Sequence, residues 1–193
     1  MREPETIRDD ELKRFRAGDR EAFTAVYSAH YPAVFRFALH MTADSQKAAE
    51  TAQDVFVWLI HHAEDYDPAR GSLGAFLTGV ARKFLQRRRY KEQRWVPFDE
   101  TLADRDRRPE GPEPDTSDAD RLRAAIAALP ERYREVVALC DLEGKSYEEA
   151  AAALECAVGT VRSRLHRARD LLARKLQRKP EESKCEVRMT WSK

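Results

Sequence analysis

The chain has 193 residues, of which 36% are charged, yet its formal net charge is only +1. No apolar run approaches the roughly 20 residues of a membrane helix, and the start of the chain lacks the apolar centre of a secretory signal. We therefore expect a soluble, cytoplasmic protein without membrane insertion. Its three cysteines lack CxxC spacing and predict reduced thiols, not a disulfide framework or a zinc site.

Helix-forming residues dominate the sequence. Glycine is scarce, and alternating β-branched runs are absent. We predict an all-α protein with two small helical domains, at residues 11–96 and 119–179, joined by a flexible acidic linker over 97–118 and followed by a tail over 180–193. The second domain is expected to contain a helix-turn-helix.

The first domain opens with a short helix predicted over 11–17, which Gly18 ends. Asp19 is suited to cap the next helix, and Tyr31-Pro32 is expected to begin a further helical stretch. Another helix should begin at Asp44 or Ser45 and run to about Glu64. Its predicted buried stripe consists of Ala52, Val55, Phe56 and Leu59. Its opposite face carries Glu50, Gln53, Asp54, Val57 and His61, for which a solvated surface is the default interpretation.

Adjacent histidines at 61 and 62 raise one alternative, a helical metal-dependent enzyme. Neighbouring residues on a helix point about 100° apart, so this pair is poorly placed to chelate one ion. The surrounding sequence also lacks an HExxH-type spacing. We predict no metal site.

A loop over 66–72 precedes a basic helix. Pro68 and Gly71 interrupt regular structure, and Ser72 is suited to cap the helix that follows. Residues 82–94 contain seven basic residues against one acid, with Phe84 and Tyr90 interleaved and Trp95 directly after. This pattern suits single-stranded nucleic acid, whose phosphates pair with the charge while its bases stack on rings. The alternative is an ordinary basic surface over core aromatics.

The linker has a different composition. Prolines stand at 109, 112 and 114, and residues 99–120 contain nine acids against three bases. Such a stretch predicts a flexible connector, whose acidity keeps the chain in solution or mimics nucleic acid. Helices should follow over 121–128, capped by Asp118 or Asp120, and over 131–140.

Two short amphipathic helices then make up the predicted helix-turn-helix. Ser146 and Glu149 have the spacing of a capping box. Residues 155–159 form the turn, and Thr160 opens or enters the second helix. The expected apolar stripe of that helix is Val161, Leu165, Ala168, Leu172 and Leu176.

The other face of this second helix is cationic. Residues 158–179 contain eight basic residues against one acid, a density that a polyanion would neutralise. The exposed candidates are Arg162, Ser163, His166 and Arg167. A helix with one buried and one cationic face suits the DNA major groove, whereas a merely solvated surface is the alternative.

Three segments resemble a known family. Residues 129–172, LPERYREVVALCDLEGKSYEEAAAALECAVGTVRSRLHRARDLL, closely resemble region 4 of bacterial RNA polymerase sigma factors of the sigma-70 family, extracytoplasmic-function (ECF) group. Residues 48–59, AAETAQDVFVWL, and 66–89, YDPARGSLGAFLTGVARKFLQRRR, resemble region 2 of the same group.

The resemblance implies a dissociable sigma subunit that is not an enzyme and needs no cofactor. Its implied partners are core RNA polymerase, promoter DNA and an anti-sigma factor. The residues implied to bind core polymerase are Glu50, Gln53, Asp54 and Val57. Those implied to bind and melt the minus-10 element are Asp67, Arg70, Gly71, Ser72, Arg82, Lys83, Arg87 and Arg88. Those implied to read the minus-35 element are Thr160, Arg162, Ser163, His166 and Arg167.

One rival function stays open from the sequence. A conventional helix-turn-helix regulator would bind DNA as a dimer without polymerase. No heptad seam for dimerisation is evident, which argues against it.

Overall fold

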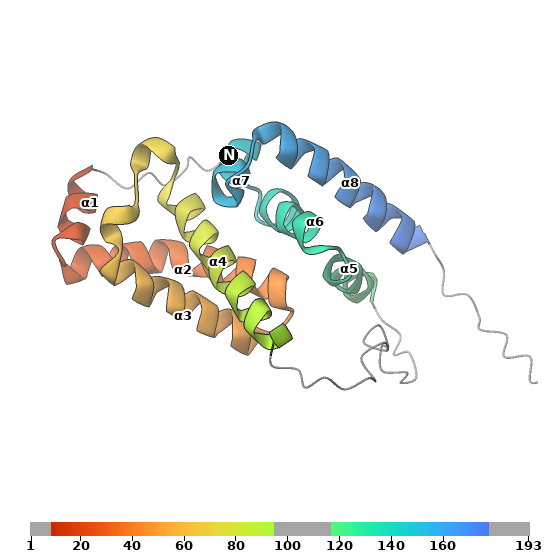
Figure 1. Ribbon diagram of the computed structural model, residues 1–193, viewed down its shortest axis with the longest axis horizontal. Helices are drawn as coiled ribbons and strands as arrows, with labels where there is room; N and C mark the ends of the chain where they lie inside the picture. The colour runs from red at the N-terminus through yellow and green to blue at the C-terminus, as the bar shows by residue number, and fades with distance from the viewer. Residues whose placement is uncertain (1–8, 95–116, 178–193) are drawn as a thin grey trace, which may run out of the picture.

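A computed structural model describes residues 9–94 and 117–177, and these residues form helices and turns without a β-strand (Figure 1). The N-terminal half consists of α1 (Asp9–Arg16), α2 (Arg20–Thr42), α3 (Ser45–His61) and α4 (Leu73–Arg94), with single 3₁₀ turns at Ala63–Asp65 and Pro68–Arg70. The C-terminal half consists of α5 (Asp118–Ala127), α6 (Glu131–Val136), a π-helical segment (Val137–Leu142), α7 (Tyr147–Leu154) and α8 (Val158–Gln177). The predicted tail and nearly all of the predicted linker lie outside the described residues, as does Trp95.

Short polar side chains begin the helices of the N-terminal half. Asp19 accepts hydrogen bonds from the backbone N–H groups of Glu21 and Ala22, and Asp44 accepts those of Gln46 and Lys47. Each bond satisfies a donor that has no partner inside the helix. The predicted cap at Asp19 is confirmed, and Asp44 caps the helix that was expected to begin at Asp44 or Ser45. α3 ends at His61, three residues earlier than expected, because the chain turns into the 3₁₀ segment at Ala63–Asp65.

One expectation for this half is wrong. Tyr31-Pro32 does not begin a new helix, because α2 continues through Pro32 for 23 residues. Proline removes the bond to the carbonyl four residues back, which here belongs to Ser28. Both residues are exposed, so water reaches that carbonyl. Packing of α2 on α3 and α4 holds the helix on both sides of the proline.

Replacing Pro32 with alanine is expected to stabilise the protein. Proline costs about 3 kcal/mol relative to alanine in a helix interior, and its restriction of the unfolded chain offsets about 1 kcal/mol of that. Urea denaturation should therefore show a gain of about 1–2 kcal/mol in the free energy of unfolding. Pro130→Ala is the control, because Pro130 precedes α6 and lies outside the helix interior. No gain at Pro32 would contradict this explanation.

The C-terminal half departs from prediction at three helix ends. α5 begins at Asp118 and is capped by Ser117, whose Oγ accepts the N–H of Asp120. The helix after Pro130 passes into the π-helical segment and continues to Leu142. α8 begins at Val158, so two residues assigned to the turn belong to its first turn. The capping box of Ser146 and Glu149 is confirmed in both directions.

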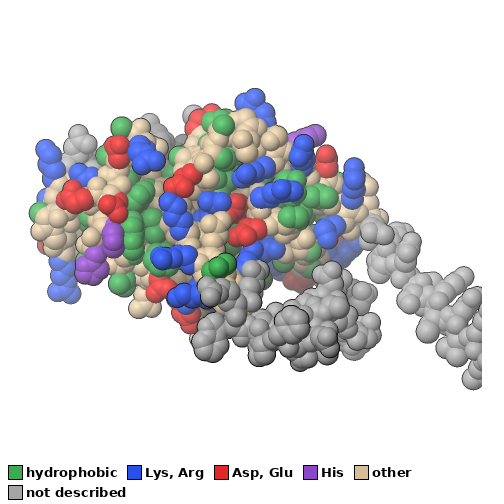
Figure 2. Space-filling view, in the orientation of Figure 1, with side chains coloured by type: hydrophobic (Ala, Val, Ile, Leu, Met, Phe, Trp, Pro, Cys, Tyr) green, Lys and Arg blue, Asp and Glu red, His purple; other side chains and the backbone are tan. Residues whose placement is uncertain are grey.

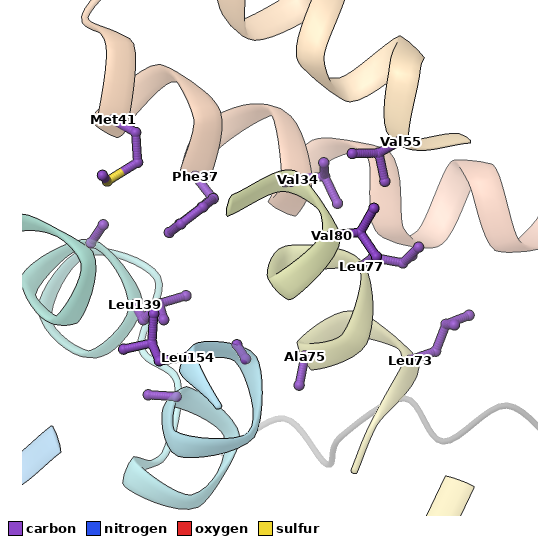
Figure 3. Packing of buried hydrophobic residues seen from close by; sticks show 14 of the residues in the cluster. Val34, Phe37, Met41, Val55, Leu73, Ala75, Leu77, Val80, Leu139 and Leu154 are labelled. Carbon is purple, nitrogen blue, oxygen red and sulfur yellow. The ribbon is translucent and has the colours of Figure 1, made fainter. Parts of the chain in front are cut away.

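A single apolar cluster runs through both halves (Figure 3). In the N-terminal half, Val34 and Val55 lie close to Leu77 and Val80 of α4. Leu139 and Leu154, from the π-helical segment and α7, face the same region from the C-terminal half. The stripe predicted for α3 is buried, with every member at most 2% exposed. One member of the apolar stripe predicted for α8 is not enclosed, because Leu176 is 36% exposed.

Cys140 lies beside this cluster in the π-helical segment and is half-buried. Burial, with a smaller effect of Asp141, raises the pKa of its thiol to about 11. The thiol is a free one.

The two halves are also joined by a nearly buried carboxylate. The side chain of Glu143 is 6% exposed and accepts hydrogen bonds from the Arg36 guanidinium of α2, with Nη2 and Oε2 2.7 Å apart. His40 Nε2 lies 3.4 Å from its other oxygen. Burial alone would raise the pKa of Glu143, but the bonds from His40 and Arg36 outweigh it and hold the pKa below the ordinary 4.5.

This carboxylate predicts a pH-dependent contribution to stability. Because its pKa is lower in the folded than in the unfolded protein, the contribution is present above about pH 4.5 and is lost as pH falls through the folded-state pKa. Glu143→Gln should lower the free energy of unfolding by about 1–2 kcal/mol at neutral pH. Chemical denaturation across pH should show this difference shrinking below about pH 4.5. Glu148→Gln, at an exposed site, is the control; a difference independent of pH would contradict the assignment.

Candidate nucleic-acid interface

The second helix of the helix-turn-helix, α8, is fixed by its apolar side. Val161, Leu165 and Ala168 are at most 1% exposed. The turn before it depends on Glu155, which has a φ of +52° and ends α7 in the left-handed region. The sharp reversal lets α8 cross the other C-terminal helices along the outside of the molecule (Figure 1).

The predicted minus-35 residues lie on the free side of this helix. Arg162, Ser163, His166 and Arg167 are all exposed, and Thr160 is half-buried at the start of the helix. Ser163 Oγ donates to the Thr160 carbonyl at 3.0 Å. The structure therefore brings all five together on one accessible surface.

A tyrosine of α6 contacts this surface. Tyr133 is 8% exposed, and a hydrogen bond with Arg167 lowers the pKa of its phenol. The guanidinium of Arg132 lies 4.8 Å from the centre of the same ring. Tyr133 therefore lies beside Arg167 of α8. Sequence reasoning missed Tyr133, which is an apolar-face residue of a short helix with nothing to connect it to residue 167.

The loop before α4 holds a defined shape. Asp67 accepts the N–H of Ala69 at 3.0 Å and caps the 3₁₀ turn, and Tyr66 donates its hydroxyl to the Gly71 carbonyl at 3.1 Å. Gly71 has a φ of +146°, a conformation open essentially to glycine alone. Ser72 Oγ accepts the N–H of Ala75, confirming the predicted cap of α4.

This loop borders a cavity of about 760 Å³. Six of the eight predicted minus-10 residues line it, namely Asp67, Arg70, Gly71, Ser72, Lys83 and Arg87. Four aromatic side chains line it as well, namely Trp58, Tyr66, Phe76 and Phe84. The far wall comes from the C-terminal half, at the end of α7 and the turn after it, within residues 151–157. Cationic and aromatic groups together suit phosphates and nucleobases.

Sequence reasoning did not single out Trp58. Its ring lies 6.0 Å from Phe76 and stacks on His62 at 4.3 Å, with an angle of 8° between the planes. The one signal in the sequence is a large aromatic residue on α3 beside the candidate polymerase-binding residues. Only the folded structure shows that Trp58 lines the same cavity as the loop before α4.

Two predicted minus-10 residues point elsewhere. Arg82 donates to Glu135 of α6, with Nε and Oε1 2.6 Å apart. Arg88 donates to Glu50 of α3 at 2.7 Å, and this bond is the main reason that the pKa of Glu50 is lowered. Arg88 therefore contacts a residue assigned to polymerase binding, not the cavity.

The predicted polymerase-binding residues share the outer face of α3. Gln53, Asp54 and Val57 are exposed, and Glu50 is half-buried beside Arg88. Val57 is 52% exposed, and Ile60, one turn further on, is 55% exposed. Two apolar side chains beside an acid form a small, partly apolar patch that a partner protein could cover.

The structure gives the metal alternative no support. Within the described ranges, no group of three or more histidine, cysteine or acidic side chains could hold an ion. His62 is engaged elsewhere, because its Nδ1 lies 2.8 Å from the Trp58 carbonyl. In the same ranges, no helix is long and apolar enough to cross a membrane.

Comparison with known proteins agrees with this arrangement. Residues 26–95 match the family Sigma-70 region 2, and residues 119–172 match Sigma-70, region 4. The ECF RNA polymerase sigma factor SigE of Mycolicibacterium smegmatis is 33% identical over 146 residues, covering 74% of this chain and 57% of that protein. The ECF RNA polymerase sigma factor EcfG of Rhodopseudomonas palustris is 28% identical over 145 residues, covering 75% of this chain and 80% of that protein.

Solved structures show the same fold. The sigma factor RpoE from Bartonella quintana, solved in complex with the anti-sigma factor NepR, superposes with a TM-score of 0.63 at 26% identity, over 81% of this chain and 97% of that one. CnrH, in complex with the cytosolic domain of CnrY, superposes with a TM-score of 0.65 at 24% identity, over 86% and 95%.

Two helical units, one carrying a helix-turn-helix with a cationic face and the other a basic helix beside an aromatic cavity, define a DNA-binding protein of transcription. The matches to regions 2 and 4 occur in order and together cover more than half of the residues. The chain belongs to the sigma-70 family of RNA polymerase sigma factors, in its extracytoplasmic-function group.

Proposed function

We propose that this chain is a dissociable sigma subunit that binds core RNA polymerase and directs promoter recognition, DNA melting and transcription initiation. The observation that carries the proposal is the presence, in one chain and in order, of regions 2 and 4. A conventional regulator needs only the second of these. The domains assigned from the sequence, at 11–96 and 119–179, are retained as part of the proposal.

The C-terminal domain docks on the minus-35 element through α8. Arg162 and Arg167 supply guanidinium groups, which pair with guanine edges or with phosphates. Ser163 and His166 lie between them on the exposed face. Thr160, near the helix start, is placed to contact the DNA backbone.

The N-terminal domain melts and holds the minus-10 element. Opening a duplex costs free energy, which a binding site for an extruded base and a cationic surface for the separated strand together offset. The cavity beside Gly71 supplies aromatic rings, and Arg70, Lys83 and Arg87 supply charge at its edge. Asp67 and Ser72 shape the loop through the bonds described above.

The outer face of α3 binds core polymerase. Val57 supplies exposed apolar surface, and Gln53 and Asp54 supply polar contacts beside it. Glu50 acts partly through its bond to Arg88. The catalytic chemistry is the polymerase's, so the chain is not an enzyme and acts in the cytoplasm. Because the similar Bartonella sigma factor was solved with an anti-sigma factor, an anti-sigma partner is included in the proposal.

Gel filtration with bacterial core polymerase, followed by transcription from a promoter library, tests this function. Co-elution together with new promoter-specific transcripts is expected. Val57→Asp should lower the amount of the chain that co-elutes with core polymerase at least about tenfold, because it places a charge in the apolar part of the contact. Ala29→Asp, at an exposed position of α2, is the matched control. Tight duplex binding without co-elution would favour the conventional regulator instead.

A further inference from the structure

The N-terminal helix α1 contacts the segment that leads into the loop before α4. It packs on α2 through Phe15, which is 5% exposed and stacks on Phe23 with the two ring centres 6.2 Å apart. This packing places α1 beside the 3₁₀ turn at Ala63–Asp65, which follows α3 (Figure 1). The match to Sigma-70 region 2 begins only at residue 26, so α1 precedes it, and no functional residue has been assigned to this helix.

Arg16, the last residue of α1, directs its guanidinium at backbone carbonyls of that segment. Its Nη2 donates to the Tyr66 carbonyl at 2.6 Å, and its Nε donates to the Ala63 carbonyl at 3.4 Å. The carboxylate of Glu64 is further away, with Oε2 3.8 Å from Nε. Hydrogen bonds from a charged donor are stronger than those between neutral groups. Arg16 therefore fixes the backbone at the point where the loop begins.

The neighbouring arginine of the same helix behaves differently. Arg14 pairs with the carboxylates of Asp19 and Glu21 at 2.7 and 3.4 Å, and its side chain is 53% exposed, against 29% for Arg16. Figure 2 shows basic and acidic side chains together at this end of the molecule. Arg14 belongs to this ordinary charged surface, whereas Arg16 is half-buried and contacts the loop.

Tyr66 connects the contact of Arg16 to the cavity. Tyr66 is 4% exposed, and its ring lines the cavity 5.4 Å from the ring of Phe76. Its hydroxyl donates to the Gly71 carbonyl at the other end of the loop. Burial raises the pKa of this phenol, so the hydroxyl keeps the proton that it donates. Arg16 thus holds Tyr66 by its backbone, and Tyr66 holds Gly71 by its side chain.

We propose that Arg16 is a positioning residue for recognition of the minus-10 element. Through Tyr66, it holds the loop before α4 in the shape that presents the cavity to a base of the separated strand. Groups that bind a ligand must be held within about 0.5 Å of their productive geometry by the residues behind them. The inference rests on the function proposed above for this loop and cavity, and it makes α1 part of the DNA-reading apparatus.

The test uses holoenzyme assembled from core polymerase and the full-length chain. Arg16→Ala removes both bonds to the loop. Arg14→Ala is the matched control, because it removes the same side chain from the same helix without touching the loop. Arg16→Lys keeps a charged donor at this position, so it should recover most of the affinity that Arg16→Ala loses.

The readout is the affinity for the single-stranded minus-10 sequence of a selected promoter, measured by fluorescence anisotropy with an abasic site at each position in turn. Arg16→Ala should bind the intact strand about three- to tenfold more weakly than the wild type, because the loop loses a charged hydrogen bond. The abasic site that costs the wild type most should cost this variant less, since changes that act on one contact are not additive. Co-elution with core polymerase and minus-35 affinity should not change.

Two results would overturn the role of Arg16. One is an Arg16→Ala chain that binds the intact strand as tightly as the wild type. The other is an equal cost of the abasic site in both proteins, which would mean that Arg16 only anchors α1. A wild type that is indifferent to every abasic site would overturn the proposed role of the cavity, and this inference with it. Failure of the wild type to co-elute with core polymerase would instead overturn the proposed sigma function.

Discussion

Replacing Arg167 with alanine is expected to weaken binding to the minus-35 duplex by about 1–3 kcal/mol, or roughly 5- to 150-fold. Arg167 lies on the exposed face of α8, and arginine is the side chain that most often reads a guanine edge, through two hydrogen bonds. The measurement is fluorescence anisotropy with the selected promoter sequence and with single-base variants of it.

The control for this prediction is Arg174→Ala, which removes the same charge two turns further along α8. It should reduce affinity slightly and equally on every sequence, because it lies far from the helix start. If Arg167→Ala also lost affinity equally on every sequence, the residue would be a phosphate contact, and its assignment to base reading would be wrong.

Leu165→Ala is expected to lower the free energy of unfolding by about 2–5 kcal/mol. Leu165 is 1% exposed and holds α8 against the other C-terminal helices, so truncation leaves a cavity under the recognition helix. Urea denaturation followed by circular dichroism measures the loss, which is a large part of the stability of a typical domain. Minus-35 binding should fall with it.

Leu176→Ala is the matched control, because the same side chain is 36% exposed one residue before the end of α8. Its cost should be below about 1 kcal/mol. Equal costs at the two positions would show that α8 is not anchored through Leu165. Loss of DNA binding without loss of stability would instead indicate that Leu165 acts on the interface itself.

Local signals in the sequence predicted local structure well. The caps at Asp19, Ser72 and Ser146 depend on a few neighbouring residues, and the sequence contains all of them. The buried and exposed faces of α8 follow from helical period alone. Pro32 was misjudged because its cost is local, whereas the packing that overrides it comes from α3 and α4.

The residues proposed for the interface could be named from the sequence, but their arrangement could not. Arg82 and Glu135 are 53 positions apart, and no periodicity connects them. The basic run of α4 suggested one continuous DNA surface, yet Arg82, Lys83 and Arg88 each bind a different acid on a different helix. Such pairings depend on how the helices pack, which a reading of single segments does not contain. Trp58 was missed for the same reason.

The thiol of Cys140 has a practical consequence. Thiolate is the form that alkylating agents and oxidants attack, and with a pKa of about 11 only about one thiol in ten thousand is ionised near neutral pH. In the folded protein Cys140 should thus resist maleimides, iodoacetamide and peroxide. Unfolding returns Cys140 to the ordinary reactivity of cysteine. The rate of peptide-resolved labelling at this residue therefore measures how often the C-terminal core opens.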